Sequence, residues 1–363
     1  MDSLEEIRKQ IDVVDAQMSG LFEARMELSR QIIDYKMTHG LAISDPAREE
    51  EVVRRNSARV GDPDIREYYV RFQKELMALS RDWQRRLSKG LRVAYSGVPG
   101  AFAYIAAARM FPGAQLVSYP DFGAAYHSCE AGETDVVVLP FENSFAGEVS
   151  TVTDLMFSGS LYVNHAAEIE AEQNLLGLPG ADKSRIREVY SHPQALAQCA
   201  EYLQRNGFEG RECSNTAVAA KKVSALQDPA VAAIGSAEAA ELYGLEVLEP
   251  RINTGTVNKT RFAAFSRMLR LDTENKRKMG KHFILMYTVK NEAGALAQTL
   301  NIIGAHNFNM CNLHSRPMKE LLWNYYFFVE LDGDVATEEG NSLLRELGPL
   351  CDRLKLVGSF YTH

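Results

Sequence analysis

Polar side chains precede an alternating apolar run in the segment NKTRFAAF, residues 258–265. Asn258, Thr260 and Arg261 stand at the start of a predicted strand. Polar residues at the mouth of a strand are typical of a ligand site. The same residues can also form the end of a loop with no function, so the decision depends on the other polar clusters of the chain.

Four further polar clusters follow predicted strands or open predicted helices: GVPG (97–100), PFENSFAG (140–147), SHPQA (191–195) and SNTAVAA (214–220). In α/β sheets, ligands bind beyond the carboxyl ends of strands and at helix N-termini. GVPG lacks the glycine spacing of a dinucleotide site and the GK[ST] ending of a P-loop. Each cluster alone fits capping and turn chemistry, since Asn215 and Thr216 are good helix caps and His192 before Pro can be structural.

Composition limits the class of protein. At 363 residues the chain suggests two or three domains, and its 46% hydrophobic and 24% charged content is ordinary for a globular protein. A net charge of −8 argues against wholesale nucleic-acid binding. No apolar run approaches the roughly 18 residues of a membrane span, and the acidic N-terminus does not read as a signal peptide. The five scattered cysteines form no CxxC pair, so we expect a reducing cytosol and no structural zinc. The sequence contains no residue cluster suited to a cofactor or metal, and none is expected.

Residues 1–88 are predicted to be all helical. Apolar side chains recur every seventh residue over a first helix of roughly 50 Å. This seam consists of Leu4, Ile11, Met18, Arg25 and Ile32 together with Ile7, Val14, Leu21, Leu28 and Tyr35. Because a small monomer cannot bury so long a stripe, we expect a partner chain or a long antiparallel neighbour.

Arg25 interrupts this seam. An arginine there can set the register of a coiled coil or extend its head to solvent. It can also be a buried cation that awaits an anion. Lys36 lies about 20° around the helix from Arg25 and about 16 Å further along. Arg8 lies about 100° from Arg25, so we expect it to reach the same pocket only from a partner helix.

Further polar residues share faces of the next two predicted helices. Asp45, Arg48 and Glu49 lie on one face of a helix at about 45–59, and Ser80 and Gln84 on one face of a helix that ends near residue 87. Cations that converge inside a helical bundle suit a compact dianion.

With these residues, the segment resembles the all-helical chorismate mutases over nearly its whole length. The resemblance implies that Arg25 and Arg48 bind the substrate carboxylates, with Arg8 supplied by the partner protomer. A Claisen rearrangement needs no nucleophile, acid or metal. It needs reacting ends held close and donors aimed at the growing charge on the ether oxygen.

The same resemblance assigns the remaining residues of the mutase site. Lys36 and Gln84 would donate to the breaking ether oxygen. Glu49 and the region of Asp45 would hold the ring hydroxyl, with Ser80 nearby.

The chain changes rhythm after residue 90. Residues 91–268 alternate short β-type runs with Ala-rich helical stretches, which predicts an α/β domain with parallel strands. The charged segment 272–281 is predicted to be a linker. Residues 282–363 show the order βαββαβ, which fits a small α+β ferredoxin-like sandwich.

The clusters ENS, SHPQAL, NTAVAA, YGLEVL and NKTRF together resemble prephenate dehydratases across about 91–267. The resemblance implies two α/β subdomains, arranged like a periplasmic binding protein, with the active site in the cleft between them. Thr260 matches the essential threonine of that family, Arg261 is placed for a substrate carboxylate, and Phe262 packs beside the ring. The remaining residues implied for the cleft are Glu142, Asn143, Ser144, Ser191, His192, Asn215 and Thr216.

The implied reaction expels carbon dioxide and water from a cyclohexadiene to give phenylpyruvate. Aromatisation drives it, so we expect Thr260 to donate a hydrogen bond to the departing oxygen in a dry cleft. The sequence leaves open whether His192 or Glu142 supplies the proton. One departure is Ala103, where the family usually carries a hydroxyl after the aromatic residue.

The motifs GALAQTL and LHSRP resemble the ligand loops of ACT domains attached to prephenate dehydratases, which bind phenylalanine at a dimer interface. Gly294 allows close backbone approach, and the following helix N-terminus favours a carboxylate. His314 stands where the family usually has Glu. The implied effector-binding residues are Gly294, Ala295, Leu296, Asn309, His314, Ser315 and Arg316. A purely dimerising sandwich is the alternative.

Taken together, the chain resembles the bifunctional chorismate mutase/prephenate dehydratases (P-proteins) with a C-terminal ACT domain. The product of the first domain is the substrate of the second, and phenylalanine is the expected allosteric inhibitor. A homo-oligomer, dimer or tetramer, is expected in the cytosol. The alternatives are a non-catalytic amino-acid-sensing regulator derived from these domains, or a chain with only one active domain. Acceptance of arogenate and channelling between the sites stay open.

Overall fold

A computed structural model describes residues 3–253, 258–270, 280–318 and 324–361. Most of the predicted linker at 272–281 therefore lies outside the described residues. The chain divides into two units, Met1–Arg92 and Val93–His363. Among the described residues, no helix combines the length and the apolar character that crossing a bilayer requires.

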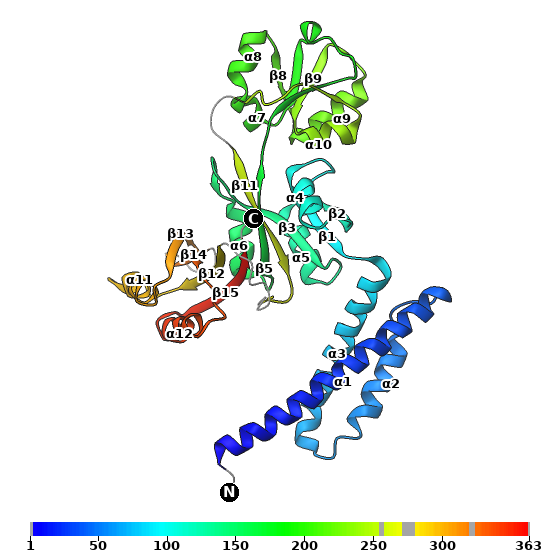
Figure 1. The fold of residues 1–363 in the computed structure, drawn as a ribbon, viewed down its shortest axis with the longest axis vertical. Helices are drawn as coiled ribbons and strands as arrows, with labels where there is room; N and C mark the ends of the chain where they lie inside the picture. The colour runs from blue at the N-terminus through cyan, green and yellow to red at the C-terminus, as the bar shows by residue number, and fades with distance from the viewer. Residues whose placement is uncertain (1–2, 254–257, 271–279, 319–323, 362–363) are drawn as a thin grey trace. The chain divides into compact units, whose positions relative to one another are not determined.

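The first unit is all helical, as predicted, and consists of α1 (Leu4–Thr38), α2 (Pro46–Ser57) and α3 (Pro63–Lys89) (Figure 1). Side-chain oxygens of Ser3, Asp45 and Asp62 cap the three N-termini, and a proline opens both α2 and α3. The third helix packs against each of the other two.

The apolar seam of α1 is mostly uncovered in the single chain. Within α1, which is described in full, only Ser29 and Ile33 are buried. The exposed seam residues are Leu4, Ile7, Ile11, Val14, Met18, Leu21, Leu28, Ile32 and Tyr35. A stripe of this length is far more apolar surface than a water-soluble helix normally leaves open.

The second unit contains two α/β halves, as predicted. In the first half, α4 (Phe102–Met110), α5 (Phe122–Glu130) and α6 (Ser150–Ser158) accompany β1 (Arg92–Ser96), β2 (Gln115–Tyr119), β3 (Val136–Asn143), β4 (Gly147–Glu148), β5 (Tyr162–Glu170) and β11 (Lys259–Ser266). The second half has its own sheet, in the order β10-β6-β9-β7-β8. Its strands are β6 (Asn174–Gly177), β7 (Glu188–Ser191), β8 (Glu209–Glu212), β9 (Val231–Gly235) and β10 (Glu246–Glu249), with helices α7 (Pro193–Gln198), α8 (Ala200–Asn206), α9 (Thr216–Leu226) and α10 (Ala237–Tyr243).

The expectation of parallel strands is only partly right. β1 pairs with β3, and β7 with β8 and β9, in parallel. β11 is antiparallel to both β3 and β5, and β6 is antiparallel to β9 and β10. The physical reason is that β5 leads the chain out of the first half and β11 brings it back, so the returning strand runs in the opposite direction.

The C-terminal segment has the predicted order βαββαβ. Its elements are β12 (Lys281–Thr288), α11 (Ala295–Ala305), β13 (Asn309–Pro317), β14 (Tyr325–Asp332), α12 (Glu338–Leu347) and β15 (Arg353–Tyr361). The two helices pack on one face of the sheet β13-β14-β12-β15. Side chains of the other face, such as Phe328 and Val357, join one buried cluster with Met156 and Val163 of the first α/β half.

The C-terminal segment and the first α/β half are also joined through backbone pairing. β15 pairs with β5 at Gly358 and Val163, so their strands belong to one continuous sheet. A Cβ at Gly358 would overlap the Val163 carbonyl oxygen and lie 2.6 Å from the Val163 Cβ. Only glycine fits this approach.

We therefore expect Gly358→Ala to destabilise the second unit by about 1–3 kcal/mol, because backbone must move to admit the methyl group. The measurement is thermal unfolding of the full chain. Gly304→Ala in α11 is the control, since a Cβ there meets nothing within 4 Å and alanine favours a helix. Equal melting temperatures for Gly358→Ala and the wild type would contradict the close junction.

Candidate functional site

A cavity of about 160 Å³ is lined by residues of both α/β halves. Its lining residues are Phe102, Asn143, Ala171, Gln173, His192, Gln194, Ala195, Gln198, Asn215, Thr216, Asn258 and Thr260. Clusters that follow different strands in the sequence therefore meet at one place. Five of the predicted cleft residues are among them.

Thr260 lies at the start of β11, directly opposite Asn143 at the end of β3. The Asn143 amide nitrogen donates to Thr260 Oγ1 at 2.9 Å and to Asn258 Oδ1 at 2.8 Å. The amide oxygen accepts from the backbone N–H groups of Phe145 and Ala146, which fixes its orientation. Because Thr260 Oγ1 accepts from Asn143, its own proton stays available for a ligand.

Helix N-termini supply the polar character of the opposite wall. Asn215 caps α9, accepting from the Val218 N–H at 2.8 Å. His192 caps α7, and its Nδ1 accepts from the Gln194 N–H at 3.2 Å. A neutral His192 therefore carries its proton on Nε2. The positive ends of these helix dipoles favour an anion in the cavity.

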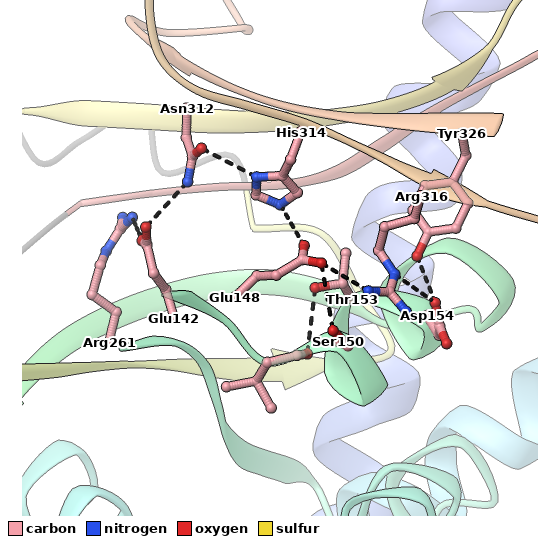
Figure 2. Close-up of polar contacts among 11 residues, drawn as sticks. Glu142, Glu148, Ser150, Thr153, Asp154, Arg261, Asn312, His314, Arg316 and Tyr326 are labelled. Atoms are coloured by element: carbon pink, nitrogen blue, oxygen red, sulfur yellow. Dashed lines mark hydrogen bonds and ion pairs between the residues drawn. The ribbon is translucent and has the colours of Figure 1, made fainter. Parts of the chain in front are cut away.

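Arg261 and Glu142 do not line this cavity, which corrects their predicted placement. The β3–β11 ladder pairs Arg261 with Glu142 but Phe262 with Pro140, so Phe141 is an extra residue. This bulge brings Glu142 to the face of Arg261 and leaves Asn143 on the face of Thr260. On their own face, Arg261 and Glu142 form an ion pair at 2.7 Å (Figure 2).

Three other predicted residues support the cleft without lining it. Ser191 is fully buried and donates to the Ile234 carbonyl at 2.8 Å. Ser144 Oγ accepts from the Lys259 N–H at 3.0 Å, which ties the loop after β3 to β11. Phe262 is buried in the sheet.

In the helical unit, two of the predicted mutase residues meet across α1 and α3. The Arg25 guanidinium donates to Ser80 Oγ and, at 3.5 Å, to the Leu76 carbonyl. Burial lowers the pKa of Arg25. Gln84, one turn further along α3, is also buried.

Partners within the chain hold three more of the predicted mutase residues. Lys36 donates to the Ile43 carbonyl at 2.6 Å. Asp45 Oδ1 accepts from the Arg48 N–H at 3.1 Å, while the Arg48 side chain pairs with Glu51 at 2.6 Å. Arg8 is exposed on α1.

Two cavities of about 720 and 430 Å³ open on this unit, and Arg81 lines both. Arg81 forms an ion pair with Glu49, the one predicted mutase residue among the lining side chains. Of the predicted mutase residues, only Glu49 lines these cavities in the described single chain. The shared site was expected to include Arg8 of a partner protomer, and it stays a prediction. The predicted residues are distributed over all three helices and the N-cap of α2, and the seam side of α1 is uncovered.

The predicted effector residues lie on two faces of the C-terminal sheet. Gly294, with φ of 83°, precedes α11, which begins with Ala295 and Leu296. Ser315 pairs with Phe327 on the face that the helices cover. His314 and Arg316 are on the other face.

On that other face, both residues meet carboxylates of the first α/β half. His314 stacks on Phe328 at 4.5 Å and lies 2.9 Å from Glu148. Arg316 pairs with Glu148 at 2.7 Å and Asp154 at 3.0 Å (Figure 2). Asn309, at the start of β13, is exposed. Within the described single chain, the predicted effector residues do not form one pocket. The resemblance implied a site at a dimer interface, and that site stays a prediction.

Known proteins match both units. The family description "Chorismate mutase type II" matches residues 7–85, and "Prephenate dehydratase" matches residues 93–269. A bifunctional chorismate mutase/prephenate dehydratase of Aquifex aeolicus is 30% identical over 377 aligned residues, which cover 99% of this chain and 98% of the relative. The chain belongs to the family of bifunctional chorismate mutase/prephenate dehydratases.

Solved structures resemble three quarters of this family member. A prephenate dehydratase of Arthrobacter aurescens in complex with L-Phe is 25% identical with a TM-score of 0.67, over 75% of this chain and 90% of that one. GqqA, described as a novel type of quorum quenching acylase, is 27% identical with a TM-score of 0.68, over 75% of this chain and 98% of that one. The chain is thus an enzyme with a chorismate mutase domain and a prephenate dehydratase domain.

The dehydratase cavity is also lined by four polar residues that the sequence analysis did not assign to the cleft. These are Gln173, Gln194, Gln198 and Asn258. Asn258 opens the NKTRF segment and Gln194 lies within SHPQA, so both stood in recognised motifs. Gln198 follows Gln194 by one helical turn, a spacing that could have indicated a shared face. Among the described residues, no group of three or more His, Cys, Asp or Glu side chains is placed to hold a metal ion.

Proposed function

We propose that the two enzyme domains act in sequence in phenylalanine biosynthesis. Residues 7–85 rearrange chorismate to prephenate, and residues 93–269 convert prephenate to phenylpyruvate. The observation that carries the second step is the hydrogen bond from Asn143 to Thr260 Oγ1, because it orients the hydroxyl proton toward other acceptors. Its position in a cavity lined by both halves supports this assignment.

In the dehydratase step, electrons of the bond to the leaving carboxylate move into the ring as the C–O bond breaks. Negative charge then grows on the departing hydroxyl oxygen, and Thr260 donates a hydrogen bond to it. His192 donates a second hydrogen bond from Nε2 to the same oxygen, because it lines the cavity whereas Glu142 faces away. The oxygen leaves as hydroxide and takes its proton from water. The N-terminus of α9, with Asn215 and Thr216, favours the carboxylate that stays.

In the mutase step, Arg25 and Arg48 bind the two carboxylates, with Arg8 contributed by a second copy of the chain. Lys36 and Gln84 donate to the ether oxygen, and Asp45, Glu49 and Ser80 complete the pocket. The uncovered seam of α1 supports a homo-oligomer, because a second copy of this helix would bury it.

We also place the enzyme in a reducing cytosol. All five cysteines are free thiols. Burial raises the pKa of Cys129 and of Cys199 to about 12, so neither is a ready nucleophile.

The test feeds the purified chain chorismate and, separately, prephenate, and follows each product by absorbance. Thr260→Ala is expected to lower prephenate turnover by about 10²–10³ while sparing the mutase, because it removes one donor to the leaving oxygen. Thr260→Ser, which keeps the hydroxyl, is the control. Arg25→Ala should have the reverse effect.

Three results would count against this assignment. Dehydratase activity retained by Thr260→Ala would refute its role. A wild-type chain that turns over neither substrate would favour the non-catalytic regulator, and turnover of one substrate would favour a single active domain.

We further propose that the C-terminal segment is an ACT domain that binds phenylalanine. The βαββαβ order and the positive φ of Gly294 before α11 support it. A similar solved structure, a prephenate dehydratase, is described as a complex with L-Phe. The ligand's carboxylate would lie at the N-terminus of α11, beside Ala295 and Leu296.

Phenylalanine is expected to raise the melting temperature and lower the dehydratase rate, because it binds one of two states more tightly. Gly294→Val should weaken both effects, since a branched side chain disfavours its backbone conformation. Gly304→Ala serves as the matched variant. Unchanged melting and unchanged rates with phenylalanine would leave the purely dimerising sandwich.

A further inference from the structure

The face of β11 that points away from the cavity carries a second polar cluster. Arg261 binds Glu330 of β14 through two nitrogens, Nη1 to Oε2 at 2.9 Å and Nη2 to Oε1 at 2.7 Å. The Glu330 side chain is 1% exposed, and His282 Nδ1 lies 3.2 Å from its Oε1. The C-terminal sheet therefore holds the residue next to Thr260.

Glu330 is charged in this setting. Burial raises the pKa of its carboxyl, but hydrogen bonds and charges from His282 and Arg261 outweigh burial and lower the pKa to about 2. A buried pair of this kind adds little net stability compared with apolar residues of the same size, whereas removing one partner leaves an unpaired buried charge.

The Arg261 side chain also fixes the bulge in β3. Its guanidinium lies 4.7 Å from the centre of the Phe141 ring, and Phe141 is the extra residue of the ladder. Arg261 pairs at the same time with Glu142, whose other oxygen accepts from Asn312 of β13 at 3.2 Å (Figure 2). The bulge is what leaves Asn143 beside Thr260.

We propose that Glu330 is a positioning residue for the dehydratase reaction. By clamping Arg261 it holds both β11 and the β3 bulge, and thereby the distance between Asn143 and the Thr260 hydroxyl. In the part of the chain that the structure describes, the Glu330 carboxylate binds Arg261 and His282, and neither residue lines the cavity. Its effect on Thr260 therefore passes through Arg261. This inference rests on the proposed role of Thr260.

A second ion-pair cluster at the same junction provides a matched control. Asp154 of α6 accepts from Arg316 at 3.0 Å and from the Tyr326 hydroxyl at 2.6 Å. It joins the C-terminal sheet to the first α/β half, as Glu330 does, but none of these contacts involves β11. Asp154→Asn therefore weakens the junction without loosening the strand that carries Thr260.

The experiment measures steady-state kinetics with prephenate, the mutase rate and thermal unfolding for the full chain. Glu330→Gln is expected to lower kcat for prephenate about 10- to 100-fold with a smaller change in KM, because the reacting groups are misplaced. Glu330→Asp, which keeps the charge on a shorter side chain, should be intermediate. Asp154→Asn should lower the melting temperature while keeping kcat within about twofold, and the mutase rate should be unchanged in all three.

The proposal is overturned if Glu330→Gln keeps the wild-type kcat, or if Glu330→Gln and Asp154→Asn lose kcat in proportion to stability. If Glu330→Gln does not fold, the test uses Glu330→Asp. A kcat for Glu330→Asp equal to that of Asp154→Asn overturns the proposal, and a lower kcat supports it. A wild-type chain with no prephenate turnover would instead sink the proposed function. A wild type that is active and insensitive to Thr260→Ala would do the same.

Discussion

The dehydratase half depends on how one returning strand pairs. β11 lies between β3 and β5 and is antiparallel to both. Adjacent residues of a strand point to opposite faces, so Thr260 and Arg261 serve different neighbours. The extra residue Phe141 shifts the register of β3 by one residue. As a result, Asn143 lies on the same face of the sheet as Thr260, and Glu142 on the same face as Arg261. A ladder without that bulge would separate Asn143 from the hydroxyl that it orients.

Much of this architecture could be predicted from the sequence because local signals agree with it. Caps such as Asp45 and Asp62 mark the helix starts, and the polar clusters after strands meet in one cavity. The alternation rule also applies to NKTRF, where two neighbouring residues cannot both face one cavity in a regular strand. The family resemblance assigned both Thr260 and Arg261 to the cleft, and the structure separates them. The bulge at Phe141 has no local signal, since it arises from pairing between strands far apart in the sequence.

In the helical unit, the sequence of one chain predicts the exposed apolar seam but not its partner. Arg25 and Lys36 are held by Ser80 and by the Ile43 carbonyl, so their charges are stabilised within the chain. The apolar seam of α1 is exposed beside them. Heptad spacing predicts such a seam. It does not identify the surface that packs against the seam, because that surface can belong to another chain.

The junction between the C-terminal sheet and the first α/β half determines how a signal could pass between them. The two parts share one buried cluster and one continuous sheet, so neither can move as a loosely tethered domain. A ligand shifts such a structure only if it binds two arrangements differently. The effector motif spans both faces of β13, with Ser315 toward the helices and His314 and Arg316 toward Glu148. A ligand at the start of α11 would act on a sheet whose opposite face packs against the first α/β half. Glu330 lies on β14, which pairs with β13. A displacement of β14 would therefore move the partner of Arg261 directly, through one charged contact.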